Sequence, residues 1–330
     1  MAYSLKAGET VPESVKRIIT EEVDSAIEHL EKGRPEERDE AIHEARKSVK
    51  KIRGVLRLIQ PEISRSFYIQ ENKRLRDLGR KLSEIRDAAA IIEVFNGLAD
   101  KYRAELREDV IASIRDGLHK NKVETESASN VDAIVRRAIS EFKQLRKRLA
   151  NVSLETDGWN TIGPGLRKYY RLGRKAMAIV AHDGTPENYH AWRKRAKDHW
   201  YHVRLLEKLW SDVMEAHEKS LKALESCLGD DHNLVVLKQK LGDDPARFGS
   251  EEPLELFTTL ADRRGQELRK EAIELGQRVY ALKPRRMEKN LAKLWHLWKA
   301  QEENEIVPPP PRKSSTSAKI VQPRATPRAS

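Results

Sequence analysis

Apolar side chains recur at intervals of three and four residues along nearly the whole chain, and no stretch alternates apolar and polar positions as a strand does. In the first half this spacing predicts helices over residues 15–30, 38–59, 64–92, 98–119 and 131–150. In the second half it predicts helices over residues 166–181, 186–210, 212–228, 254–281 and 284–299. The breaks coincide with Gly- and Pro-containing segments such as Gly163-Pro164-Gly165. The chain is therefore predicted to be all-α.

The composition agrees with a helical protein and restricts its class. Of the 330 residues, 35% are charged and only 6% are aromatic, a mixture that favours helices. No apolar run approaches the ~20 residues that cross a bilayer, and the polar N-terminus lacks the apolar core of a secretory signal. The single cysteine, Cys227, excludes an internal disulfide framework and fits a reducing compartment. We expect a cytoplasmic protein that makes no membrane contact.

Near residue 306 the composition changes to a Pro- and Ser-rich segment that carries five Lys or Arg and no acid. Such a segment cannot bury a core, so residues 306–330 are predicted to be a disordered basic tail. The tail either adds loose affinity for anions or is a solvated segment of no fixed role.

An eight-residue basic pattern occurs twice in the folded part of the chain. His43-Glu-Ala-Arg-Lys-Ser-Val-Lys50 returns 147 residues later as His190-Ala-Trp-Arg-Lys-Arg-Ala-Lys197. The next helix repeats at an offset of 146 residues, in the pairs Lys73 with Lys219 and Arg76 with Lys222. An internal duplication explains this order. It divides the chain into two halves, residues 1–152 and 153–305.

Each copy of the pattern forms one cationic face when it is wound into a helix. At ~100° per residue, the cations of the first copy fall within roughly 80° of its histidine: His43, Arg46, Lys47, Lys50, Arg53 and Arg57. The second copy places its cations in the same arc: His190, Arg193, Lys194, Lys197 and Arg204. Apolar residues such as Ile52 and Trp192 lie opposite and are predicted to face the core.

The charges on these faces differ from those of an ordinary exposed helix, which mixes signs to form stabilising pairs. Residues 43–57 hold six Lys or Arg and one acid, and residues 190–204 hold five and one. The whole chain has 63 Lys or Arg against 52 acids, a formal net charge of +11, and these two segments account for most of it. Positive charge focused in this way indicates an anionic partner. The alternative, two solvated helix faces, is disfavoured because the pattern recurs at matched positions.

Further motifs follow the basic octets in order. They are Leu-Ser-Glu-Ile-Arg-Asp-Ala at 82–88, Tyr-Arg-Leu-Gly-Arg-Lys at 170–175, Leu-Gly-Asp-Asp-His-Asn at 228–233 and Leu-Trp-His-Leu-Trp at 294–298. Together these segments resemble those of the CHAD family, the conserved histidine α-helical domain, over about residues 10–303. Ser83 and Asn233 depart from the family pattern, which usually has Gly and Asp there. The chain is identified as a stand-alone member of this family.

The resemblance implies two four-helix bundles related by an internal pseudo-twofold axis, with a basic groove or channel between them. It also implies binding of inorganic polyphosphate, and association with polyphosphate granules for some members. Many relatives carry a triphosphatase domain on the same chain. This chain has no room for one, so the resemblance leaves it to act alone or as an accessory subunit of a separate triphosphate-processing enzyme.

The chemistry of the basic faces suits that ligand. Polyphosphate presents a line of negative charges and no bases, and Arg and Lys donate well to phosphate oxygens. The two histidines are expected to contribute more when protonated, near an ordinary pKa of ~6.5 that a bound polyanion would raise. The predicted polyphosphate-binding residues are His43, Arg46, Lys47, Lys50, Arg53, Arg57, Lys73, Arg76, Arg80, Arg171, Arg174, His190, Arg193, Lys194, Lys197, Arg204, Lys219 and Lys222.

Other interpretations stay open at this point. An enzyme is disfavoured because no catalytic motif is present: His43-Glu44 begins like a zinc-protease motif, but Lys47 stands where the second histidine belongs. No catalytic residue, metal site or cofactor is predicted. The basic faces could also hold the phosphates of DNA or RNA, although they lack a recognition motif and interleaved aromatic side chains. A granule scaffold would use the same site. The oligomeric state is not readable from the sequence.

Overall fold

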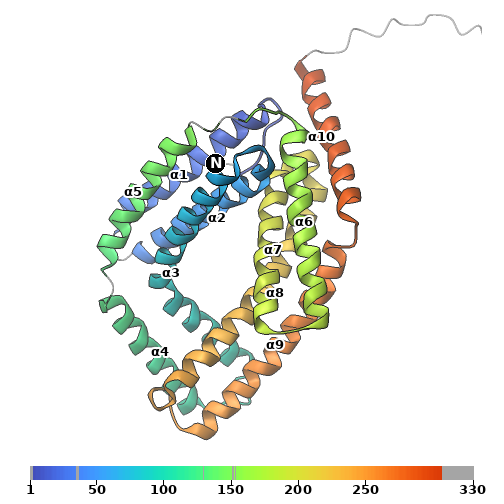
Figure 1. Ribbon diagram of the computed structural model, residues 1–330. Helices are drawn as coiled ribbons and strands as arrows, with labels where there is room; N and C mark the ends of the chain where they lie inside the picture. Colours follow the sequence, from blue (N-terminus) through green and yellow to red (C-terminus); the bar gives the residue numbers. More distant parts are fainter. Residues whose placement is uncertain (1–2, 35–36, 129, 151, 153, 307–330) are drawn as a thin grey trace, which may run out of the picture.

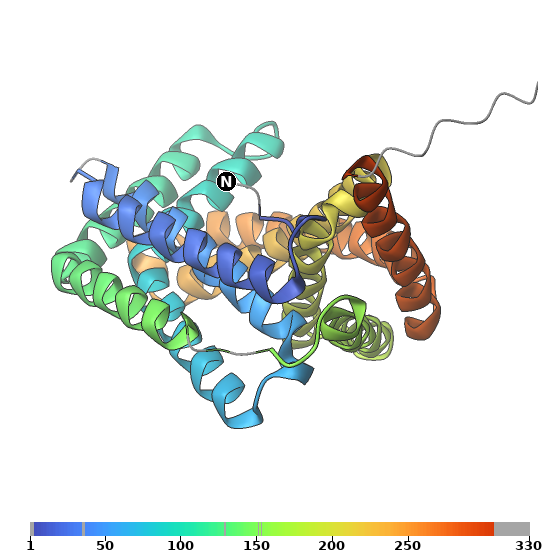
Figure 2. The ribbon, with the colours of Figure 1, turned by 90° about the horizontal axis from the view of Figure 1, so that it is seen from above.

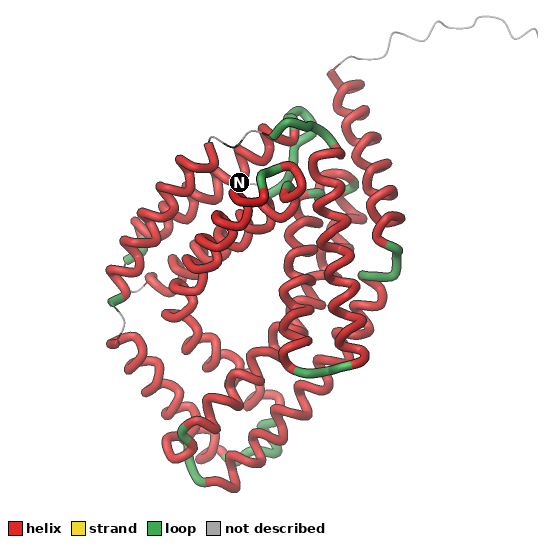
Figure 3. The backbone as a smooth tube through the Cα atoms, in the orientation of Figure 1, coloured by secondary structure: helices red, strands yellow, loops and turns green. Residues whose placement is uncertain are grey.

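The computed structural model describes residues 3–34, 37–128, 130–150, 152 and 154–306. These residues are almost entirely helical (Figures 1 and 3), and no strand occurs among them. The α-helices are α1 (Val11–Lys32), α2 (Arg38–Leu58), α3 (Arg65–Lys101), α4 (Glu108–Ala128), α5 (Val131–Ala150), α6 (Trp159–His182), α7 (Pro186–Leu205), α8 (Ser211–Asp243), α9 (Glu251–Val279) and α10 (Pro284–Ile306). Short 3-10 turns are η2 (Gln60–Glu62), η3 (Glu207–Leu209) and η4 (Pro245–Arg247). The all-α prediction is confirmed, while the predicted tail lies outside the described residues, apart from Ile306.

Local sequence signals begin several helices. The Thr10 hydroxyl accepts from the backbone N–H of Glu13, and the Glu13 carboxylate accepts from the backbone N–H of Thr10, which completes a capping box for α1. The Thr185 hydroxyl caps α7 by accepting from Asn188 N at 3.3 Å, and Pro186 occupies the first helical position. These contacts satisfy backbone donors that a helix start leaves without a partner.

Several predicted helix boundaries are wrong. The helix predicted over residues 98–119 lies at Glu108–Ala128, and the last helix ends at Ile306 rather than at residue 299. In three further cases packing overrides a local break signal. Helix α6 begins at Trp159 and continues through Pro164. Helix α3 continues past Gly97 to Lys101, since Phe95 and Leu98 are buried there. Helix α8 does not end near Leu228 but runs to Asp243, because the apolar stripe continues through Leu234, Leu237 and Leu241.

Each series of five helices packs mainly on itself. In the first, α1 contacts α2 and α5, α2 contacts α3, and α3 contacts α4. In the second, α6 contacts α7 and α10, α7 contacts α8, and α8 contacts α9. The two series meet where α2 packs on α6 and α7, and where α3 packs on α8 (Figures 1 and 2).

Close backbone approach fixes the contact between α2 and the second series. A Cβ on Gly165 of α6 would lie 1.8 Å from the Leu58 carbonyl oxygen at the end of α2, so only glycine fits. A Cβ on Gly54 of α2 would lie 2.9 Å from Tyr201 Cβ of α7. The Gly54 carbonyl accepts a hydrogen bond from His202 Nε2 at 3.1 Å. Burial lowers the pKa of His202 to about 3, so the ring is neutral and donates from that nitrogen.

Candidate anion-binding site

The basic faces of α2 and α7 meet at a pocket of about 370 Å³. Helix α2 contributes His43, Arg46 and Lys50, and helix α7 contributes Arg193. The remaining walls come from α3 and α8: Ala90, Ile91, Glu93, His232, Asn233 and Val236. Four of the predicted binding residues, from both copies of the repeat, therefore line one cavity.

Helical spacing explains the α2 wall. His43, Arg46 and Lys50 are three and four residues apart, which places them on one face. Ala45, Val49 and Ile52, on the opposite face of α2, are 0–2% exposed and pack in the core. Burial of that apolar stripe holds the three polar side chains toward the pocket.

On the α7 side, a buried carboxylate from α8 lies among the cations. Glu225, 3% exposed, accepts from Lys197 Nζ at 2.8 Å and from Lys222 Nζ at 3.1 Å. Arg193 Nη2 lies 3.3 Å from the same carboxylate. The cation Lys197, with Arg193 and Lys222, lowers the pKa of Glu225 to about 2 against the effect of burial, so this group is charged at neutral pH.

Lys50 lies opposite these residues in a strongly cationic environment. Burial, followed by the charges of Lys197 and Arg46, lowers the pKa of Lys50 to about 7. The amine is therefore partly neutral at physiological pH. A bound polyanion would favour its protonated form.

His232 of α8, which lines the pocket with His43, packs its ring against that of His190 of α7. The rings of His190 and His232 lie 3.9 Å apart between centroids. Burial and the neighbouring His232 lower the pKa of His190 to about 4, and burial also lowers the pKa of His232. The expectation that His190 titrates near its ordinary value in the free protein is therefore wrong, because the repeat pattern did not reveal the second ring.

Three predicted binding residues contact other protein groups at helix interfaces and do not line this pocket. Arg57, with a side chain 14% exposed, pairs with Asp198 of α7 at 2.9 Å. Arg204 pairs with Glu218 at 3.3 Å, and its guanidinium lies over the rings of Tyr3, Trp200 and Tyr201. Arg53 donates to Asn72 Oδ1 at 3.1 Å.

The other predicted residues do not line this pocket. Arg174 donates to the Leu282 carbonyl at 2.7 Å, and Lys219 is an exposed partner of Glu215. Lys47 pairs with Glu44 at 2.6 Å, and Lys222 is half-exposed beside Glu225. The exposed remainder consists of Lys73, Arg76, Arg80, Arg171 and Lys194.

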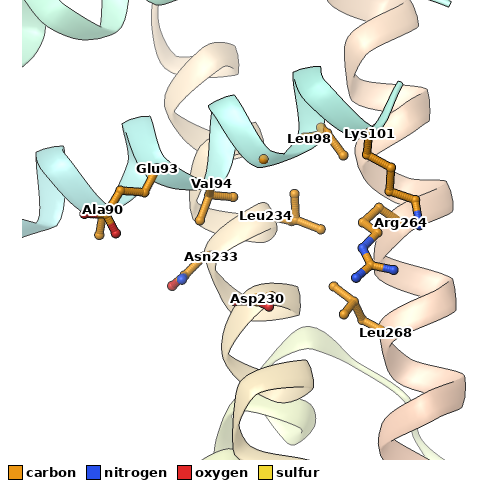
Figure 4. A pocket seen from close by; sticks show the side chains of 11 residues that line it. Ala90, Glu93, Val94, Leu98, Lys101, Asp230, Asn233, Leu234, Arg264 and Leu268 are labelled. Carbon is orange, nitrogen blue, oxygen red and sulfur yellow. The ribbon is translucent and has the colours of Figure 1, made fainter. Parts of the chain in front are cut away.

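A second pocket of about 340 Å³ adjoins the basic one and shares Ala90, Glu93 and Asn233 with it (Figure 4). Its lining is mixed. Leu234 and Leu268 supply apolar surface, and the charged side chains Asp230, Lys101 and Arg264 lie among them. Both cations already pair with Glu267, so this pocket offers no excess positive charge to an anion.

Comparison with known proteins places the fold in a family. A family model of the CHAD domain matches residues 17–242, more than half of the chain. The chain belongs to the CHAD family. The CHAD fold is also seen in the crystal structure of the CHAD domain from the plant Ricinus communis, with a TM-score of 0.59 and 15% sequence identity over 85% of this chain and 95% of that chain. No curated protein sequence matches the chain.

The helix projection missed two residues that line the pocket of this CHAD domain, His232 and Asn233, and it missed Glu225, which contacts the pocket residue Arg193. His232 and Asn233 belong to the motif at 228–233, which supported the family resemblance but was not assigned to the site. Glu225 occupies the position that the 146-residue offset aligns with Gly79, so the repeat itself gave no signal for an acid.

The described part of this CHAD domain contains no group of three or more His, Cys, Asp or Glu side chains that could hold a metal ion. Asp230 and Asp231, which could have suggested one, lie within α8, and Asp231 instead pairs with Arg269 at 2.8 Å. Cys227 is buried, and burial raises the pKa of its thiol to about 11. None of the helices in the described ranges is long and apolar enough to cross a membrane.

Proposed function

We propose that this CHAD domain binds inorganic polyphosphate and performs no catalysis. The observation that carries the proposal is the joining of His43, Arg46 and Lys50 from one copy of the repeat with Arg193 from the other at a single pocket. Guanidinium and ammonium groups on opposite walls suit a ligand with oxygens on every side. The family is linked to polyphosphate and triphosphate chemistry, which supports the same ligand.

The proposal includes an internal duplication. We infer that α1–α5 and α6–α10 are repeats related by a pseudo-twofold axis near the α2–α7 contact, with the basic pocket as part of a groove between them. Two observations support this. The basic octets begin at equivalent depths of α2 and α7, and corresponding helices have corresponding packing partners in the two series.

Binding of nucleic acid by the same residues is less well supported. Stacking of bases needs open aromatic faces beside the cations. Trp200 is the aromatic residue nearest to such a role, but Arg204 and Lys222 both lie over its ring, at 5.2 and 5.0 Å from the centroid. We therefore propose polyphosphate as the partner. A role on cytoplasmic polyphosphate granules, alone or beside a separate triphosphate-processing enzyme, follows from this proposal.

The test is a titration of the full chain with long-chain polyphosphate at several salt concentrations, with double-stranded DNA as competitor at equal phosphate. We expect binding that weakens steeply with salt, because each neutralised phosphate releases a counterion, and that DNA does not displace. Displacement by DNA at equal phosphate would instead make nucleic acid the ligand.

The lowered pKa of Lys50 leads us to expect that polyphosphate binding is coupled to proton uptake. With a pKa of about 7 in the free protein, its amine is largely neutral at pH 8. The polyanion stabilises the charged amine, so a proton is taken up on binding and affinity falls as pH rises above about 7. Calorimetric titration at pH 8 in buffers of different ionisation enthalpy measures this uptake. Lys50→Arg, which stays charged, should lose it, and unchanged uptake in this variant would assign the proton to another group.

A further inference from the structure

The carboxylate of Glu225 lies among three cations next to the pocket residue Arg193. This carboxylate is 3% exposed and reaches Lys197 at 2.8 Å, Lys222 at 3.1 Å and Arg193 at 3.3 Å. A carboxylate surrounded by three cations presents the same chemistry that a phosphate group of the ligand would present: negatively charged oxygens within hydrogen-bond distance of ammonium and guanidinium donors.

The two halves of the site differ in this respect. At the 146-residue offset that aligns α3 with α8, the counterpart of Glu225 is Gly79, whose added Cβ would meet only Val49 within 4 Å. The position of α3 that aligns with Glu225 therefore carries no carboxylate, and the acid that α3 contributes to the pocket, Glu93, lies at a different position in the helix.

We propose that Glu225 is an internal counter-anion that occupies part of the polyphosphate site in the unliganded protein and that an incoming phosphate group displaces. This inference rests on the proposed function and adds a mechanism to it. Because Glu225 is tethered to α8, it competes with any small anion at a high effective concentration. A long chain that contacts both walls at once overcomes this competition, whereas a short anion does not.

The experiment compares Glu225→Gln with wild type in binding tripolyphosphate and long-chain polyphosphate. The matched control is Asp231→Asn, which removes one negative charge from another carboxylate of α8, equally buried and also paired with an arginine. We expect Glu225→Gln to bind tripolyphosphate about tenfold more tightly or better, since one repulsive charge beside the ligand is gone. Asp231→Asn should bind like wild type.

If the ion pairs of Glu225 are purely structural, Glu225→Gln should not increase the affinity for tripolyphosphate. Glu225→Gln would then lower thermal stability and leave the affinity for tripolyphosphate equal to or below that of wild type, and this result overturns the proposal. Glu225→Asp is the second variant, for use if the amide does not fold. This variant keeps the charge but draws the carboxylate back toward α8. We therefore expect a smaller gain in affinity for tripolyphosphate than with Glu225→Gln. An absence of any gain would count against the proposal.

The controls separate this inference from the proposed function. If wild type binds long-chain polyphosphate but Glu225→Gln gains no affinity for tripolyphosphate, only the role of Glu225 is overturned. If neither wild type nor the variants bind either chain, the polyphosphate proposal is overturned with it.

Discussion

Replacing Arg46 and Lys50 together by glutamine is expected to weaken polyphosphate binding by about 10²–10⁴-fold. Each side chain lines the pocket, and a charge-assisted hydrogen bond contributes roughly 1.5–3 kcal/mol, so two of them give that range. The slope of affinity against salt should also become shallower by about two counterions. The α2 residues are chosen because Arg193 and Lys197 also neutralise Glu225. Breaking a buried pair of that kind costs about 3–5 kcal/mol, which would confuse binding with folding.

The matched control is Arg103→Gln with Arg107→Gln, in the connection between α3 and α4. Their side chains are 66% and 80% exposed, and the control removes two positive charges, as many as the pocket variant does. It should keep nearly wild-type affinity. Equal losses in both double variants would mean that the protein attracts polyanions by net charge alone, and loss of helical circular dichroism in the pocket variant would mean that Arg46 and Lys50 are structural.

Gly165→Ala should destabilise the fold, whereas Gly97→Ala should stabilise it slightly. An alanine Cβ at position 165 would lie 1.8 Å from the Leu58 carbonyl oxygen, so α6 must move away from α2, and we expect a loss of about 3 kcal/mol. At position 97, in the last turn and a half of α3, no atom lies within 4 Å of an added Cβ. There the higher helix propensity of alanine should add about 0.5–1 kcal/mol.

Thermal unfolding followed by circular dichroism measures both effects. We expect the midpoint of Gly165→Ala to fall by roughly 5 °C or more and that of Gly97→Ala to rise by a degree or two, given about 2–4 °C per kcal/mol in chains of somewhat smaller size. Equal midpoints for the two variants would show that α6 and α2 are not held at the separation described above.

Much of the fold was readable from local patterns. The three- and four-residue spacing of apolar side chains located each long helix in the described ranges. The predicted ends are less accurate, most of all for α8, which runs to Asp243 rather than to residue 228. Thr185-Pro186 gave the start of α7, because a cap and a first-turn proline act within a few residues. The predicted break at Gly163-Pro164-Gly165 is wrong: Gly163 packs against Trp159 of the same helix, and Gly165 allows close approach to Leu58, which is distant in sequence.

The sequence predicts only some of the residues at the candidate site. The repeated octet selected His43, Arg46, Lys50 and Arg193, which line one pocket, because a helix projection fixes which side chains share a face. A projection does not say where a neighbouring helix crosses that face. Arg57 lies on the same arc, one turn beyond Arg53, yet it meets Asp198 and becomes a buried ion pair.

The sequence by itself thus determined the helical class, the family and the two cationic faces, all of which depend on residues close together in the chain. The tertiary structure alone decided which cations face the pocket, that Lys50 has a pKa of about 7, and that Glu225 lies among the cations of α7. Burial and charge–charge distances act across helix contacts, so they exist only after α2, α3, α7 and α8 have packed together.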